Sequence, residues 1–342
     1  MSKAHFLTFA LGLAGGLCFL ATGLPLPWLF GPLLACLIAA LCGVKLAAVK
    51  VLNESMRTIL GVAAGATVTV SFLQTLAGMA PTLALIPVMI LCIGLIGVPY
   101  FQKVWGYDWA TAYYSAMPGG LQDMLVFGEE AGGNVRVLSL IHATRVVVIV
   151  MALPIILKLA WDADLSNPPG APSTDLQPAQ MVIMVACALI GWQLAKRMGM
   201  FGASILGPLL LTALASVTGL LTTRPPAEAI WVAQYFIGIT VGVKYVGITS
   251  AEIRRDVTAG IGFCVILIAL TLAFIGFVHL LDIAPPMETI LALAPGGQAE
   301  LVVLALVVGA DMTFVVAHHL LRIFLVILGA PLFARLFGKP HG

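Results

Sequence analysis

The chain has 342 residues, of which 61% are hydrophobic and only 9% are charged, against roughly 25% charged residues in soluble domains. So large an apolar fraction excludes an ordinary water-soluble protein, because only a lipid bilayer solvates that much apolar surface. The formal net charge of +2 is too small and too scattered to favour direct binding to nucleic acid. The composition predicts an all-α polytopic membrane protein surrounded by the lipid bilayer.

Ten apolar segments follow one another along the chain, each close to the roughly 17–25 residues that a membrane-spanning helix needs. The predicted spans are 5–23, 25–42, 55–73, 79–98 and 135–157 in the first half, and 179–195, 202–221, 229–248, 257–281 and 311–334 in the second half. The first span follows Lys3 and has the form of a signal peptide. Because a matching segment recurs near residue 179, we expect both to be retained.

The two halves repeat each other at an offset of 176 or 177 residues, as 295 − 118 = 177 for the Pro-Gly-Gly motif illustrates. The positions matched at 177 are Pro118-Gly119-Gly120 with Pro295-Gly296-Gly297, His142 with His319, Arg145 with Arg322, Pro154 with Pro331, Gly61 with Gly238, and Gly65 with Gly242. The sequence therefore predicts membrane repeat 1 at 1–161, an extracytoplasmic linker at 162–178 and membrane repeat 2 at 179–342.

Each repeat has five predicted spans, and because five is odd, the second repeat should enter the membrane from the opposite side. Lysine and arginine favour cytoplasmic loops. With the N-terminus in the cytoplasm, the basic residues on the cytoplasmic side are Lys3, Lys45, Lys50, Lys103, Arg136, Lys196, Arg197, Arg254, Arg255, Arg335 and Lys339. The alternative counts each Pro-Gly-Gly segment as a sixth span and gives parallel repeats, but it would place Lys196 and Arg197 outside. The charges favour two inverted repeats of five transmembrane helices with both termini cytoplasmic.

The segments around the two Pro-Gly-Gly motifs, 107–130 and 286–309, are too polar and too interrupted for a lipid-facing helix. Irregular backbone at membrane depth is tolerated only where it is buried in protein or lines a wet cavity. We expect each segment to form a re-entrant hairpin with its Pro-Gly-Gly turn at the tip, entering from opposite faces of the membrane. The alternative is that each motif merely bends a helix for packing.

Charged and histidine side chains are expected near the middle of the bilayer. Arg145 and Arg322 lie about ten residues into their helices, or ~15 Å, where an arginine is costly unless it is paired or faces a cavity. The predicted substrate-binding residues are Pro118, Gly119, Gly120, Arg145, Pro295, Gly296, Gly297 and Arg322, and the predicted ion-coupling residues are Asp123, His142, Glu300 and His319. The alternative is that Arg145–Asp123 and Arg322–Glu300 are static ion pairs that fasten the hairpins.

The sequence predicts no metal, cofactor or catalytic residue, and hence no enzyme. The adjacent His318 and His319 would point about 100° apart on a helix, and the other histidines form no cluster. The six cysteines lie in or next to apolar stretches and form no C-x-x-C motif, so we interpret them as packing residues.

Four segments carry a resemblance that covers nearly the whole chain: GYDWATAYYSAMPGGLQDM, HATR, APGGQAELVVLAL and HHLLR. They resemble the AbrB-duplication membrane protein family, whose members carry names such as AbrB family transcriptional regulator and ammonia monooxygenase. The resemblance implies a bacterial inner (plasma) membrane protein with an influence on gene expression. No loop here is long enough for a DNA-recognition helix, so that influence would be indirect.

The preferred hypothesis is a secondary transporter of a small anionic solute, coupled to H⁺ or Na⁺, because inverted repeats with broken helices are typical of such transporters. The alternatives are a membrane-embedded sensor that indirectly regulates gene expression and, third in rank, a membrane monooxygenase. A homodimer is an allowed assembly.

Overall fold

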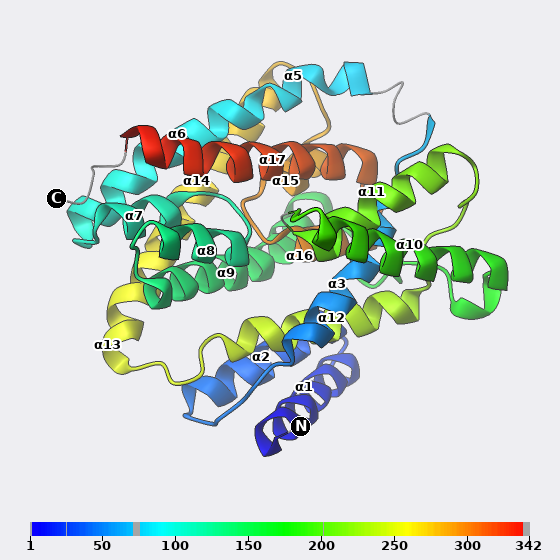
Figure 1. The fold of residues 1–342 in the computed structure, drawn as a ribbon, viewed down its shortest axis with the longest axis horizontal. Helices are drawn as coiled ribbons and strands as arrows, with labels where there is room; N and C mark the ends of the chain where they lie inside the picture. The colour runs from blue at the N-terminus through cyan, green and yellow to red at the C-terminus, as the bar shows by residue number, and fades with distance from the viewer. Residues whose placement is uncertain (1, 25, 71–75, 201, 338–342) are drawn as a thin grey trace. The chain divides into compact units, whose positions relative to one another are not determined.

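The computed structural model describes residues 2–24, 26–70, 76–200 and 202–337 (Figure 1). Within these ranges the chain consists of helices and connecting loops without a strand, so the predicted all-α class is confirmed. Residue 25, residues 71–73 of the third predicted span, and Lys339 lie outside the described ranges.

In the described chain, seven helices of the first sequence half have a counterpart about 177 residues later, whereas the short helices α5 and α13 do not match each other at this offset. The first half contains α1 Lys3–Ala21, α2 Pro27–Leu41, α3 Lys50–Gly65, α5 Ala80–Leu83, α6 Leu85–Pro99, α7 Trp109–Ala116, α8 Leu121–Glu130 and α9 Val135–Trp161. The second half contains α10 Pro178–Arg197, α11 Ala203–Val217, α12 Ala227–Val243, α13 Ser250–Glu252, α14 Thr258–Leu280, α15 Pro286–Leu293, α16 Gln298–Val308 and α17 Met312–Phe337. Both bounds of α7 and α15 differ by 177 residues (286 − 109 and 293 − 116), so the duplicated sequence folds into duplicated elements.

Six helical segments in the described chain are long and apolar enough to cross a membrane, which is compatible with a membrane location. They are Lys3–Ala21, Ala80–Val104, Val135–Trp161, Pro178–Arg197, Ser250–Leu280 and Met312–Ala334. The other four predicted spans correspond to α2, α3, α11 and α12, which have only 15, 16, 15 and 17 residues. At 1.5 Å per residue they are about 23–26 Å long, slightly less than the ~30 Å hydrocarbon core.

The chain divides into two compact units that do not follow the sequence halves. Unit 1 comprises Met1–Ala77, Pro154–Ile248 and Ala299–Thr313, and unit 2 comprises Gly78–Leu153, Thr249–Gln298 and Phe314–Gly342. Each unit therefore combines helices from both repeats. The predicted linear division at 162–178 concerns the repeating sequence and stays a prediction.

In unit 1, the two repeats exchange their third helices, so that each third helix packs against the second helix of the other repeat. Helices α1 and α2 pack together, as do α10 and α11, while α3 packs against α11 and α12 packs against α2. Glycine makes the exchanged contacts possible: a Cβ atom at Gly61 would lie against the Ile205 carbonyl oxygen, and one at Gly238 against the Leu29 carbonyl oxygen. Small residues at such crossings let two backbones approach closely.

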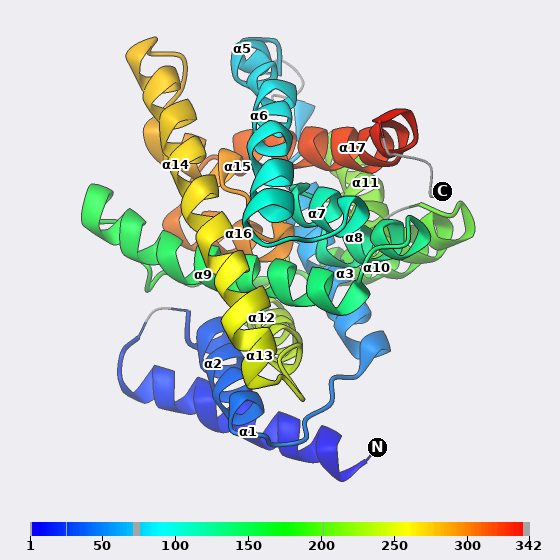
Figure 2. The same cartoon turned by 90° about the vertical axis from the view of Figure 1, so that its left-hand side faces the viewer.

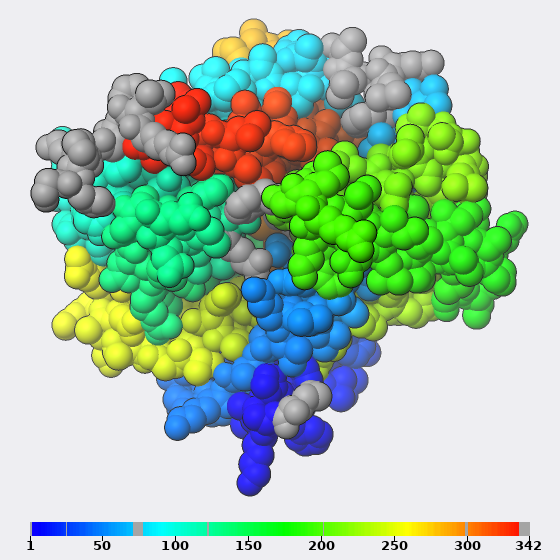
Figure 3. Space-filling model, viewed as in Figure 1, coloured from blue at the N-terminus to red at the C-terminus, as the bar shows by residue number. Residues whose placement is uncertain are grey.

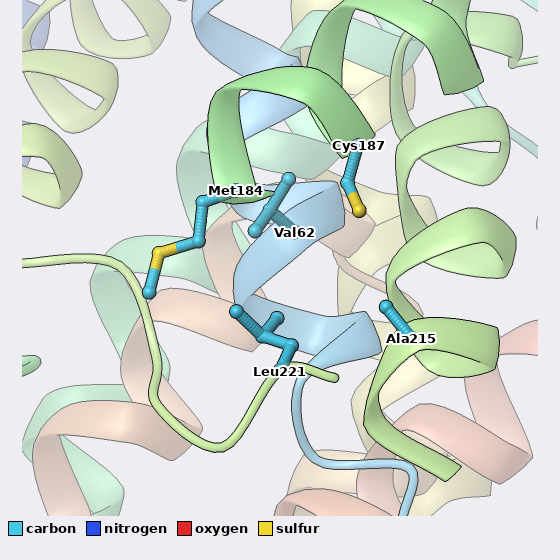
Figure 4. Close-up of a cluster of buried hydrophobic side chains, with 5 residues drawn as sticks. All are labelled: Val62, Met184, Cys187, Ala215 and Leu221. Atoms are coloured by element: carbon cyan, nitrogen blue, oxygen red, sulfur yellow. The ribbon is translucent and has the colours of Figure 1, made fainter. Parts of the chain in front are cut away.

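A cluster of buried apolar side chains packs between helices of unit 1. The cluster in Figure 4 joins α3, α10, α11 and the loop after α11, and its residues are Val62, Met184, Cys187, Ala215 and Leu221. The outer surfaces of α10 and α11 are visible together in Figure 3. Large apolar side chains on α10 are exposed, namely Val182, Val185, Leu189 and Ile190. An apolar outer face of this kind suits contact with lipid.

In unit 2, the counterpart helices α6 and α14 lie side by side (Figure 2), with α7 against α6 and α15 against α14. Gly97 on α6 faces the ring of Phe263 on α14, and the Tyr100 hydroxyl donates a hydrogen bond of 3.0 Å to the Ala259 carbonyl oxygen. The long helices α9 and α17 carry the buried His and Arg side chains described next.

Candidate functional site

Each Pro-Gly-Gly motif lies in a break between two short helices. Helix α7 ends at Ala116 and α8 begins at Leu121, while α15 ends at Leu293 and α16 begins at Gln298. Proline disfavours helical backbone at the residue before it, so each helix stops just ahead of Pro118 or Pro295. The last carbonyl groups of a helix that ends in this way have no partner within the helix.

The chain returns after α8 to the beginning of α7. Asp108 caps the N-terminus of α7 by accepting a hydrogen bond of 2.8 Å from the Thr111 backbone N–H. The Thr111 hydroxyl oxygen in turn accepts a hydrogen bond of 2.8 Å from the backbone N–H of Asn134, which precedes α9. A Cβ atom at Gly133 would also lie against the Thr111 backbone nitrogen. The two ends of the α7–α8 segment therefore meet.

Buried side chains of α9 bind the carbonyl groups around the first break. Arg145 donates hydrogen bonds to the Met117 carbonyl oxygen (3.1 Å) and to the Gly119 carbonyl oxygen (2.7 Å). His142, one turn earlier, places Nε2 2.9 Å from the Tyr114 carbonyl oxygen, so this nitrogen carries the proton and donates. Both side chains are at most 2% exposed. Side chains of α9 thus supply hydrogen-bond donors to the backbone carbonyl groups at the C-terminal end of α7.

The second break repeats this arrangement 177 residues later. His319 Nε2 lies 3.0 Å from the Leu291 carbonyl oxygen, and Arg322 donates a hydrogen bond of 2.7 Å to the Ala294 carbonyl oxygen. In both repeats the donor follows its acceptor by 28 residues. Duplication has therefore preserved individual hydrogen bonds as well as helix bounds.

Charges at the breaks match the dipoles of the short helices. The C-terminal carbonyl end of a helix is partly negative and the N-terminal end partly positive. The two arginines bind the carbonyl ends of α7 and α15, whereas Asp123 and Glu300 lie in the first turns of α8 and α16. The Asp123 carboxylate lies over Gly120, where a Cβ atom would meet it. Arg145 and Arg322 belong to the same unit and also repel each other electrostatically.

Several buried polar atoms of unit 2 have no hydrogen-bond partner among the described residues. They are Trp105 Nε1, Ser115 Oγ, His142 Nδ1, Arg145 Nε, Thr271 Oγ1, His318 Nε2, His319 Nδ1 and Arg322 Nε. Buried polar groups in proteins are nearly always paired with protein or water, and an exception calls for an explanation such as an unseen ligand. Unit 2 therefore contains a polar interior that its own described side chains do not satisfy.

All of the predicted site residues except Glu300 belong to unit 2; Glu300, which is 8% exposed, belongs to unit 1. The structure joins each predicted arginine and histidine to the break of its own repeat. The recorded partners of these side chains are backbone carbonyls, which no sequence motif marks. Ser115 and the unpartnered nitrogen of His318 are not predicted as site groups by the sequence, since a serine in an apolar helix gives no signal and the adjacent histidines suggest only a metal pair.

In the described part of the chain, His, Cys, Asp and Glu side chains form no group of three or more that could hold a metal ion.

Two comparisons with known proteins show what this chain is similar to. The family described as Transition state regulatory protein AbrB matches residues 28–338. The chain is 28% identical to "Uncharacterized protein YhjN" of Bacillus subtilis (strain 168), over 97% of this chain and 93% of that protein. It is 24% identical to "Putative regulator AbrB" of Escherichia coli (strain K12), over 93% of this chain and 91% of that protein. Since the family matches most of its length, the chain belongs to the AbrB family.

Proposed function

We propose that this AbrB-family protein is a secondary transporter of a small anionic solute, driven by H⁺ or Na⁺, in the bacterial inner membrane. One observation carries the proposal: two duplicated helix breaks are each bound by a buried arginine and histidine, and polar atoms around them are left without partners. In transporters, broken helices place such half-helix ends at the substrate site. The predicted solute is small because the site is formed from backbone and single side chains.

The transporter is proposed to consist of two inverted repeats of five transmembrane helices, each with a re-entrant Pro-Gly-Gly hairpin. The hydrogen bond between Asn134 and Thr111 supports the hairpin, since a segment that returns to its starting point adds no crossing. The expected cytoplasmic side for both termini follows from the positions of lysine and arginine.

Single cysteines in a cysteine-free background test this topology. Ser2, Ser166 and Met198 are exposed and fall in the N-terminus, the linker and the loop after α10. The inverted arrangement predicts that Ser2→Cys and Met198→Cys react with a membrane-impermeant maleimide from the cytoplasmic side, and Ser166→Cys from the other side. Parallel repeats of six spans predict instead that Ser2→Cys and Ser166→Cys react from the same side.

In this mechanism Arg145 and Arg322 supply the positive potential that attracts the solute, and the glycines of both breaks let the solute approach the backbone. Asp123, Glu300, His142 and His319 are assigned to the coupling ion, because carboxylates and imidazoles exchange protons or bind Na⁺. The competing interpretation is static: the arginines only fasten the breaks and carry no solute.

Flux into proteoliposomes separates these interpretations. A panel of radiolabelled organic acids is offered under imposed pH and Na⁺ gradients to wild type, Arg322→Gln and Lys158→Gln. Lys158 is a matched control because its exposed side chain pairs with Asp162 at the end of α9. We expect uptake by wild type and Lys158→Gln, and uptake at least tenfold slower for Arg322→Gln. Equal uptake by Arg322→Gln, or no uptake above empty liposomes, would contradict the proposal.

A second function is a membrane-embedded sensor that regulates gene expression without net transport, which the name of the E. coli relative favours. Direct contact with nucleic acid is not part of this proposal. It predicts that expression changes caused by deleting the gene are reversed by a variant that cannot transport, such as Gly119→Val, in which a branched side chain would meet Met124. A membrane monooxygenase ranks third, and metal analysis of the purified protein tests it.

A further inference from the structure

The two equivalent arginines of unit 2 differ in how many hydrogen bonds they make. Arg145 uses both terminal nitrogens, Nη1 toward Met117 and Nη2 toward Gly119. Among the described residues, Arg322 donates from Nη1 alone, to the carbonyl oxygen of Ala294, which is the counterpart of Met117. The Nε atom is buried without a hydrogen-bond partner among the described residues in both arginines, so the difference lies at Nη2. Arg322 as a whole is 4% exposed.

The difference leaves one edge of the Arg322 guanidinium group unused. Nε and Nη2 lie on the same edge, and their N–H groups point in parallel. Two parallel donors match the two oxygens of a carboxylate, or two oxygens of a phosphate, and arginine binds both in this bidentate way. In the first repeat the corresponding arginine has already committed Nη2 to the Gly119 carbonyl oxygen.

We propose that the two arginines have separate roles, in which Arg322 binds the solute through an oxyanion and Arg145 holds the first helix break in shape. This inference rests on the proposed transport function and names the chemical group that the site recognises: two oxygens of a carboxylate or a phosphate on the Nε–Nη2 edge of Arg322.

The surroundings of Arg322 suit an anion. His319 lies one turn earlier on α17 and His318 next to it, and each has one ring nitrogen on a backbone carbonyl oxygen and a second, buried one without a partner in the described residues. That second nitrogen donates a hydrogen bond to an oxyanion when the ring is protonated. The positive charge of Arg145 adds to that of Arg322 within the same unit. A bound oxyanion would relieve the repulsion between the two arginines, whereas the single carbonyl bond of Arg322 does not.

Lysine substitutions test these separate roles, because lysine keeps the positive charge but lacks the planar pair of parallel N–H donors of arginine. Purified Arg322→Lys, Arg145→Lys and the control Lys158→Gln are compared with wild type in detergent. Acetate, succinate and inorganic phosphate are titrated as sodium salts against sodium chloride at equal ionic strength. The readouts are the melting temperature without anion and the apparent Kd from the rise in melting temperature.

We expect at least one of the three anions to bind wild type and Lys158→Gln saturably, and Arg322→Lys to bind it at least tenfold more weakly. Arg145→Lys should lower the melting temperature without anion by more than Arg322→Lys does, yet keep the Kd within threefold of wild type. Acetate or succinate binding without phosphate binding identifies a carboxylate, and the reverse identifies a phosphate group.

Equal weakening of anion binding in both lysine variants, or no binding of any of the three anions to wild type, overturns the inference. These failures are distinct from failure of the proposed function. If Arg322→Lys loses anion binding as expected but wild-type proteoliposomes show no flux, the oxyanion site is supported and the proposed transport function is refuted. If wild-type proteoliposomes show flux and Arg322→Lys binds the anion like wild type, the transport function is supported and the proposed role of Arg322 is refuted.

Discussion

The two units hold their duplicated helices together in opposite ways. In unit 1 the exchanged helices meet backbone to backbone, with Gly61 against the Ile205 carbonyl group and Gly238 against the Leu29 carbonyl group. In unit 2 long cationic side chains reach across to carbonyl groups at helix breaks. Close packing of small residues needs no polar atom in the interior, whereas the arginine arrangement keeps charge there.

The two arrangements also differ in how well duplication has preserved them. The glycine contacts of unit 1 are matched pair for pair in the two repeats. In unit 2, the hydrogen bond from Arg145 to Met117 has its counterpart in the bond from Arg322 to Ala294. The second bond, from Arg145 to Gly119, has no counterpart at Arg322 among the described residues. The apolar contacts fit the role of a scaffold, and the departure from symmetry lies at the polar breaks, where function would act on one copy alone.

The largest expected effect is in unit 2. Arg145→Met leaves two buried carbonyl groups unsatisfied, so we expect the free energy of unfolding to fall by about 2–4 kcal/mol. Arg322→Met leaves one carbonyl group unsatisfied and should cost about half as much. Unfolding in mixed detergent–SDS micelles measures both, and an equal loss in the two variants would remove the difference between the breaks.

The next effect tests unit 1. Gly61→Ala and Gly238→Ala each place a methyl group against a backbone carbonyl oxygen that cannot move aside, so each should lower the free energy of unfolding by about 1–3 kcal/mol. The two values should agree because the contacts are duplicates. Gly276→Ala is the control: this glycine also lies within a helix but faces open space, and alanine there should be neutral or stabilising. Similar losses at all three positions would refute close packing as the cause.

The smallest effect concerns the histidines. His142→Phe and His319→Phe each lose one hydrogen bond to a carbonyl oxygen, and we expect each to lower the free energy of unfolding by about 1 kcal/mol. Anion binding at Arg322 should weaken more in His319→Phe than in His142→Phe, since only His319 is on α17. The same titrations in detergent measure both quantities.

Much of the fold follows from sequence patterns with a direct physical cause. The repeated Pro-Gly-Gly motifs mark both helix breaks, since proline followed by two glycines strongly disfavours continuous helix. The lengths of α2, α3, α11 and α12 were overestimated, because apolar residues continue beyond the point where each helix ends. For example, α12 ends at Val243, whereas the predicted span continues to residue 248, past Gly247 with a positive φ of 72°.

The site was predicted less completely than the fold. His142, Arg145, His319 and Arg322 were identified because charge and imidazole are costly in an apolar helix. Their carbonyl partners could not be identified, since every residue carries a carbonyl group and only the ending of α7 and α15 leaves these ones unsatisfied. The interleaving of the repeats in unit 1 was also missed, because an offset in sequence does not say which copy packs against which.

That exchange of third helices has a consequence for biosynthesis. When the ribosome has finished α3, its packing partner α11 has not yet been synthesised. The same holds for α2, whose partner α12 comes later still in the chain. The contact surfaces of the early half of the polypeptide therefore stay uncovered until the later half has been synthesised. For the same reason, two half-length genes expressed together should assemble this packing, as a single-repeat ancestor would have done with a second copy of itself.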